Sequence, residues 1–176
     1  MKFEATGIPG LQLIRLDRRA DERGYFARLW CGEELAAAGL VSSVAQVNTG
    51  FSPRAGTLRG LHHQVEPHLE VKIVRCVRGA VFDVAVDLRP TSPTYRQWRG
   101  FELREGDDQM LYIPAGCAHG YQTLVDDSEL VYFASTPYAP AAARGARWND
   151  PALAIHWPRE VSVISQADAS WPPLAP

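Results

Sequence analysis

The chain has 176 residues, 46% of them hydrophobic and 22% charged, a balance that predicts one globular domain over residues 1–176 and excludes disorder and fibrous repeats. Its 18 basic and 20 acidic side chains nearly cancel, and since no stretch concentrates Lys or Arg, we expect no nucleic-acid partner. No apolar run approaches the roughly 20 residues that span a bilayer, so we expect no membrane association and a cytoplasmic location.

Thirteen prolines and fourteen glycines divide the chain into short segments in which apolar and polar residues alternate. In chain order, this pattern predicts a strand at 12–16, a short helix at 33–38, and strands at 44–48, 71–88, 98–103, 109–113 and 130–134, followed by a short helix near Asp168. Many short strands favour an all-β sandwich or jelly roll, because a parallel α/β sheet would need long crossover helices.

The clearest alternation lies in residues 71–88, where Arg78-Gly79 separates two apolar stretches. The second stretch has an apolar face formed by Phe82, Val84, Val86 and Leu88. Its other face is acidic and contains Asp83 and Asp87. We therefore expect a hairpin between two packed sheets. The Pro- and Ala-rich tail at 167–176 is expected either to be a loosely ordered end or to cover the site.

The densest polar cluster is the segment 56–64, GTLRGLHHQ, which contains His62. Ten residues later comes Lys72, one of only two lysines against sixteen arginines, between the β-branched Val71 and Ile73. An ammonium in such a strand needs a compensating charge or ligand. Two interpretations of Lys72 stay open, a structural ion pair and a site residue.

A second cluster, 113–120, ends a strand in a turn and then presents His119. The two clusters resemble the cupin motifs G-x5-H-x-H and P-x-G-x2-H, which hold a metal inside a small barrel. Here Gln64 replaces the second histidine, so we expect no metal, and histidines that act as acid, base or hydrogen-bond donors. Cys31, Cys76 and Cys117 form no C-x-x-C pair and are expected to be reduced, structural thiols.

Further blocks carry a closer resemblance over most of the chain: 21–26, 46–48, 56–64, Lys72, 79–89, 118–120, 132–138, 148–151 and 157–158. Their order and spacing resemble the dTDP-4-dehydrorhamnose 3,5-epimerase family of nucleotide-sugar cupins. The resemblance implies a cupin-type jelly roll with a few short helices. It also implies an isomerase that needs no cofactor and forms a homodimer.

The family's substrate is a nucleotide-linked 4-keto-6-deoxyhexose, whose C4 ketone acidifies the hydrogens on C3 and C5. By resemblance, His62 removes a proton and Asp168 orients His62. Lys72 would lie beside the developing enolate oxygen, and Tyr132 would return a proton from the opposite face. Without the resemblance, Tyr132 would be interpreted as an ordinary core aromatic.

The resemblance also implies which residues bind the substrate. Arg23 and Arg59 would bind the diphosphate, with Arg23 reaching the neighbouring subunit's site. The remaining residues of this set are Phe26, Arg28, Gln46, Asn48, His119 and Tyr138. Arg28 stands where the family commonly has Glu and cannot accept hydrogen bonds, so the base is left open as thymine in dTDP, cytosine in CDP, or another.

Three alternatives remain. A ketoisomerase of the same cupin group would move the carbonyl from C4 to C3 and would need no acid opposite His62. A metal-dependent oxygenase would use His62, His63 or His119 with a carboxylate such as Glu70, and metal analysis would detect it. A non-catalytic sugar-nucleotide-binding cupin would keep the arginines without needing His62, Lys72 and Tyr132 together.

Overall fold

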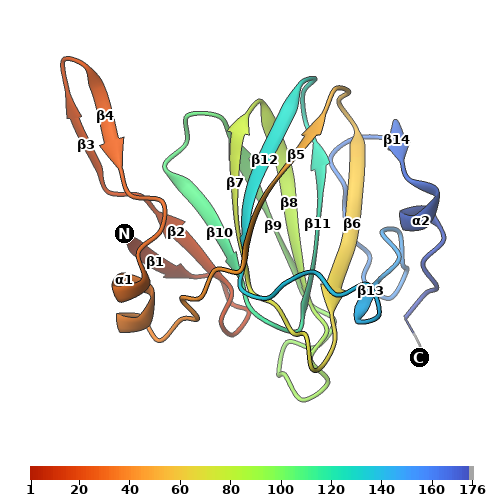
Figure 1. Cartoon of the computed structure of the whole chain (residues 1–176). Helices are drawn as coiled ribbons and strands as arrows, with labels where there is room; N and C mark the ends of the chain where they lie inside the picture. Colours follow the sequence, from red (N-terminus) through yellow and green to blue (C-terminus); the bar gives the residue numbers. More distant parts are fainter. Residues whose placement is uncertain (175–176) are drawn as a thin grey trace.

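The computed structural model describes residues 1–174 and is built from two facing antiparallel sheets (Figure 1). The first sheet has the spatial order β1-β2-β10-β7-β12-β5. Its strands are β1 (Lys2–Ala5), β2 (Gln12–Arg15), β10 (Gln109–Ile113), β7 (Lys72–Arg78), β12 (Ser128–Ala134) and β5 (Gln46–Ser52). This sheet supplies one wall of the site described below.

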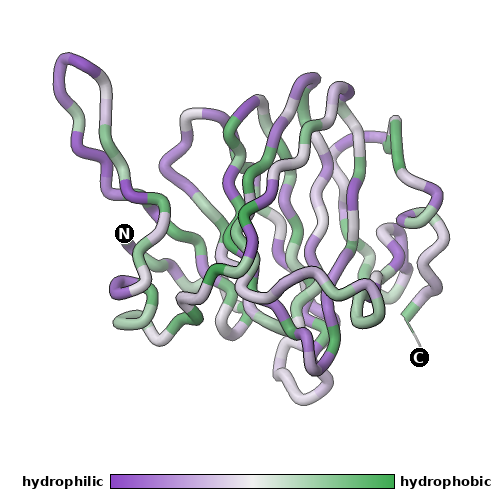
Figure 2. The backbone as a smooth tube through the Cα atoms, in the orientation of Figure 1, coloured by the Kyte–Doolittle hydropathy of each residue, from purple (hydrophilic) through white to green (hydrophobic). Residues whose placement is uncertain are grey.

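The second sheet has the order β13-β6-β11-β8-β9, and β14 pairs in parallel with β6. Its strands are β13 (Ala143–Gly145), β6 (Thr57–Gln64), β11 (Cys117–Thr123), β8 (Ala80–Asp87), β9 (Trp98–Arg104) and β14 (Val163–Ile164). The two sheets form the all-β jelly roll that the strand pattern predicts, of the cupin type that the resemblance implies. Hydrophobic and hydrophilic residues alternate along many of these strands (Figure 2).

A two-stranded arm, β3 (Arg18–Asp21) and β4 (Gly24–Ala27), projects away from the two sheets (Figure 1). Its tip is hydrophilic (Figure 2). Two aromatic side chains on β4 are exposed, Tyr25 at 50% and Phe26 at 68%. An arm with exposed aromatic residues is a surface suited to contact with another chain.

The prediction of a hairpin at 71–88 is wrong, because its two strands do not pair with each other. β7 lies in the first sheet and β8 in the second, so the chain crosses between the sheets at Gly79. The apolar face of β8, with Val84 and Val86, packs on Leu153 and Ile155 of the C-terminal segment. Asp83 is nevertheless fully buried, because its face also turns inward.

Both short helices are confirmed, α1 (Gly32–Ala37) and α2 (Gln166–Ala169). The strands expected at 12–16, 98–103, 109–113 and 130–134 are confirmed within two residues, and the one expected at 44–48 starts at Gln46 and runs on to Ser52. The sequence analysis did not predict β1, β3, β4, β6, β11, β13 or β14. Within residues 1–174, no helix has the length and apolar character to cross a membrane.

Candidate active site

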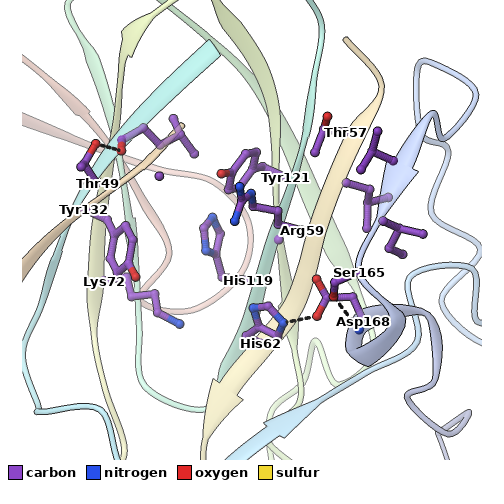
Figure 3. Close-up of a pocket in the computed structure, with 16 residues that line it drawn as sticks. Thr49, Thr57, Arg59, His62, Lys72, His119, Tyr121, Tyr132, Ser165 and Asp168 are labelled. Carbon is purple, nitrogen blue, oxygen red and sulfur yellow. Dashed lines mark hydrogen bonds and ion pairs between the residues drawn. The ribbon is translucent and has the colours of Figure 1, made fainter. Parts of the chain in front are cut away.

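Two adjoining cavities lie beside β6, between the sheets, and Figure 3 shows the first of them. The Arg59 pocket, of about 550 Å³, is also lined by His119 and Tyr121. The Tyr138 pocket, of about 620 Å³, is also lined by Gln46 and Asn48. The two pockets share four lining residues, His62, Lys72, Tyr132 and Asp168. The four expected catalytic side chains therefore meet in one cleft.

His62 and Asp168 form a dyad across β6 and α2. His62 Nε2 lies 2.6 Å from Asp168 Oδ1, and the Gly60 amide donates to Asp168 Oδ2 at 3.2 Å. Ser165 caps α2, since its Oγ accepts from the Asp168 amide at 3.0 Å. Burial raises the pKa of Asp168, but these hydrogen bonds outweigh it and leave the pKa below its usual value. Asp168 is thus held as a carboxylate against the imidazole.

Gly60 allows β6 to approach β11 closely beside this dyad. Its φ is +128°, and a Cβ at this position would lie 2.5 Å from the Gly120 Cα. A side chain here would push the strands apart. In the paired strands His62 lies opposite His119, which brings the two histidines to the same cleft.

His119 is oriented by Asp83, a residue that the sequence analysis placed on a strand face but assigned no role in the site. His119 Nε2 lies 3.0 and 2.9 Å from the two carboxylate oxygens of Asp83, and both residues are buried. The sequence did contain a signal for Asp83, namely a carboxylate between apolar residues of a strand. Such a group needs a partner when it is buried.

Lys72 and Tyr132 lie on the first sheet, across the cleft from His62 (Figure 3). Lys72 Nζ pairs with Glu70 Oε1 at 2.7 Å. Burial and the charge of Glu70 raise the pKa of Tyr132, against a smaller lowering by Arg59. Tyr132 is therefore a protonated phenol at neutral pH. Lys72 is thus ion-paired, as one interpretation expects, and it also lines the cleft, while its role in the site stays a prediction.

Arg59 supplies a fixed cation in the Arg59 pocket. Its Nε donates to Ser52 Oγ at 3.2 Å and its Nη2 donates to the Phe51 carbonyl at 2.9 Å. Within residues 1–174 neither of these partners is a carboxylate, so the positive charge remains available to an anionic ligand.

The Tyr138 pocket gathers the expected nucleotide-side residues. Gln46 Oε1 accepts from the Tyr138 amide at 2.8 Å, and Asn48 lines the same cavity. Trp171 of the C-terminal tail lines it too, and packs so closely on Gly145 that a Cβ there would lie 2.1 Å from Trp171 Cε2. The described part of the tail, up to residue 174, thus covers the site, while 175–176 lie outside the described residues.

Within residues 1–174, three expected binding residues line neither pocket. Arg23 is 82% exposed at the tip of the β3–β4 arm and pairs with Asp21. Phe26 is exposed on β4, and Arg28 pairs with Glu34 at 2.8 Å. The chain's own fold does not bring these residues to the cleft.

The described residues contain no group of three His, Cys, Asp or Glu placed to hold a metal ion. Gln64, at the position of the second cupin histidine, instead ties two loops together. Its amide accepts from the Ala139 amide at 2.6 Å and donates to the carbonyls of His68 and Pro137 at 3.1 and 3.3 Å. The adjacent His63 is held neutral, because burial and the charges of Lys72 and Arg144 lower its pKa.

Comparison with known proteins identifies the family. The family model described as dTDP-4-dehydrorhamnose 3,5-epimerase matches residues 5–176. The dTDP-4-dehydrorhamnose 3,5-epimerase of Sinorhizobium fredii is 43% identical over 99% of this chain and 90% of its own length. The dTDP-4-dehydrorhamnose 3-epimerase of Streptomyces niveus is 40% identical over 96% and 81%.

A solved structure agrees with the sequence relatives. The crystal structure of the Bacillus anthracis dTDP-4-dehydrorhamnose 3,5-epimerase, with TDP and PPi bound, superposes with a TM-score of 0.94 at 36% identity, covering 98% of this chain and 99% of that one. Fold, cleft and sequence point to the same group of isomerases. The chain belongs to the dTDP-4-dehydrorhamnose 3,5-epimerase family.

Proposed function

We propose that this protein epimerises a nucleoside-diphosphate-linked 4-keto-6-deoxyhexose at C3, at C5 or at both, in the cytoplasm. The observation that carries the proposal is the arrangement of one cleft. His62, backed by Asp168, lies on one side, and Lys72 and Tyr132 lie on the other (Figure 3). Such a cleft places a base, a cation and an acid around one sugar ring.

The proposed reaction begins at the imidazole. Because Nε2–H of His62 donates to Asp168, Nδ1 carries the lone pair that takes the proton from the carbon beside the ketone. The C–H electron pair forms a carbon–carbon double bond, and the C4 oxygen becomes an enolate. The ammonium of Lys72 stabilises that negative charge.

Inversion then requires a proton from the other side of the ring. The phenol of Tyr132 donates it to the carbon as the enolate electrons return and the C4 ketone forms again. The substrate's proton is left on His62 and Tyr132 is left as a phenolate, so proton exchange with solvent restores the starting state. A second cycle at the other carbon would complete a 3,5-epimerisation.

We infer that Arg59 binds the diphosphate and that Gln46, Asn48 and Tyr138 border the base. Arg28 is engaged by Glu34. The Gln and Asn amides offer both donors and acceptors, which fits a pyrimidine base. The names of the relatives favour dTDP as the nucleotide, and CDP is the alternative that the Arg28 substitution raises.

A homodimer accounts for Arg23 and Phe26, which lie far out on the β3–β4 arm. In this arrangement the arm of one subunit reaches the cleft of its partner. The edge strand β5 adds exposed apolar surface, with Val47 at 56% and Phe51 at 43%. Light scattering tests this directly, and a monomeric mass at micromolar concentration would contradict it.

Proton NMR in D2O tests the function. 4-Keto-6-deoxyglucose linked to dTDP and, separately, to CDP is incubated with the enzyme, and deuterium entry at C3 and C5 is followed. Exchange with inversion at both carbons identifies a 3,5-epimerase, and inversion at one identifies a mono-epimerase. Migration of the carbonyl to C3 would show a ketoisomerase, and the absence of exchange with both nucleotides would overturn the proposal.

A further inference from the structure

Glu70 is paired with Lys72, one of the four residues that line both pockets, although no step of the proposed reaction uses Glu70. It occupies the loop between β6 and β7, lines the Tyr138 pocket, and its side chain is 11% exposed. Its Oε1 lies 2.7 Å from Lys72 Nζ, and the Lys72 side chain is 12% exposed. Two opposite charges with so little surface exposed to solvent interact strongly.

The backbone on both sides of Glu70 is tied to the segment that follows β12. Thr136 Oγ1 donates to the Leu69 carbonyl at 2.8 Å. On the other side, the Val71 amide donates to Ser135 Oγ at 2.8 Å, and the Ser135 amide donates to the Val71 carbonyl at 3.0 Å. These bonds hold the loop at Glu70, so the carboxylate is a fixed point of the cleft.

We propose that Glu70 is a positioning residue for the epimerisation, holding the Lys72 ammonium in the cleft and placing a negative charge in the pocket that Tyr132 also lines. The inference rests on the proposed function. A lysine side chain has four rotatable bonds, and its ammonium must lie at the C4 oxygen as charge develops there. A short bond to a fixed carboxylate selects the conformation that points into the cleft.

The second effect is on the proton of Tyr132. Burial and, to a smaller extent, the Glu70 charge raise the pKa of this phenol, while Arg59 lowers it. The other titratable or charged groups that line the same cleft are His62, His63, Lys72, His119, Tyr121, Tyr138, Arg144 and Asp168. The charge of Asp168 is directed at His62 by their short contact. Glu70 therefore moves the loss of the Tyr132 proton to higher pH, in addition to the effect of burial.

Two variants separate the effects. Glu70→Gln keeps an oxygen that accepts from Lys72 but removes the charge, whereas Glu70→Ala removes both. At pH 7 we expect Glu70→Gln to keep kcat within about threefold of the wild type and Glu70→Ala to lose about tenfold or more. The control is Glu102→Gln, which removes an exposed carboxylate paired with Arg104 on β9. Circular dichroism and thermal unfolding verify that each variant folds.

The charge effect is measured without substrate. The absorbance of tyrosinate near 295 nm is followed on raising the pH, and subtracting the same titration of the matching variant that also carries Tyr132→Phe isolates Tyr132. We expect Glu70→Gln to lower the pKa of Tyr132 and to move the alkaline limb of kcat to lower pH with it. The Glu102→Gln curves should coincide with those of the wild type.

The proposal is overturned if the Tyr132 titration of Glu70→Gln coincides with that of the wild type, or if Glu70→Ala retains the wild-type kcat at pH 7. Because the titration needs no turnover, its result can be interpreted even if the assigned reaction is wrong. If Glu70→Gln lowers the pKa of Tyr132 but the wild-type protein exchanges no substrate protons, the charge effect is supported and the proposed function is rejected.

Discussion

The imidazole of His62 and the carboxylate of Asp168 meet at 2.6 Å although 106 residues separate them in the chain. β6 carries the histidine, and the capped turn of α2 carries the aspartate. The last described elements of the fold thus complete a site whose other parts lie in the two sheets. This contact decides which nitrogen of His62 is free to accept a proton.

Asp168→Asn tests the role of the carboxylate. The amide keeps the shape of the side chain but can donate to Nε2, which would shift the imidazole to the wrong tautomer. We expect kcat to fall by about 10² to 10⁴, with a much smaller change in KM, because substrate contacts elsewhere in the cleft remain. Steady-state kinetics check this, and a loss of less than tenfold would contradict the assigned role.

Ser165→Ala tests how the aspartate is positioned. The hydroxyl caps α2 by accepting from the Asp168 amide at 3.0 Å, and such caps contribute about 1 kcal/mol. Losing this cap loosens the turn, so we expect kcat to drop by about tenfold and the free energy of unfolding to fall by about 1 kcal/mol. The matched control is Ser170→Ala, at the other end of α2, where Oγ donates to the Ala167 carbonyl. Equal kinetics for the two variants would argue against positioning by the cap.

Asp87 governs acid stability at the end of β8. Its burial raises the pKa, but hydrogen bonds from Arg89, Ser92 and Thr94 lower it far more, so the pKa lies well below the usual range. A lowered pKa in the folded state gives stability that is present above about pH 4 and is lost as the pH falls towards the folded pKa. We expect Asp87→Asn to cost about 2 kcal/mol at pH 7, and less at pH 2.

Urea unfolding at the two pH values measures this difference. The control is Asp108→Asn, which removes a half-exposed partner of Arg15 and should change stability by less than about 0.5 kcal/mol at either pH. A deficit for Asp87→Asn that is the same at pH 7 and pH 2 would rule out a titrating carboxylate as its cause.

The sequence predicts the sheets well where one face of a strand is apolar and the other polar. It misassigns 71–88 because β7 and β8 are buried on both faces, so alternation cannot show that they belong to different sheets. His62 and Lys72 stand out through local clustering and scarcity. Asp168 is found only by resemblance, since an aspartate in an Ala- and Pro-rich tail carries no local signal.

Other parts of the cleft depend on contacts between distant segments. Asp83 is recognised as part of the site only because β11 places His119 against it. Glu70 is recognised only because the loop before β7 brings its carboxylate to Lys72. Trp171 reaches the Tyr138 pocket because Gly145 leaves room for its ring. Periodicity and local motifs contain no information on such pairings.

The central claim is that a base and an acid act from opposite sides of the sugar ring, and Tyr132→Phe in D2O tests it most directly. The phenylalanine keeps the ring but has no proton to give, while His62 and Asp168 are untouched. Proton NMR would follow deuterium at C3 and C5 together with the configuration of the sugar. We predict that deuterium enters while inversion slows by about 10² or more. Inversion at the wild-type rate would contradict the account.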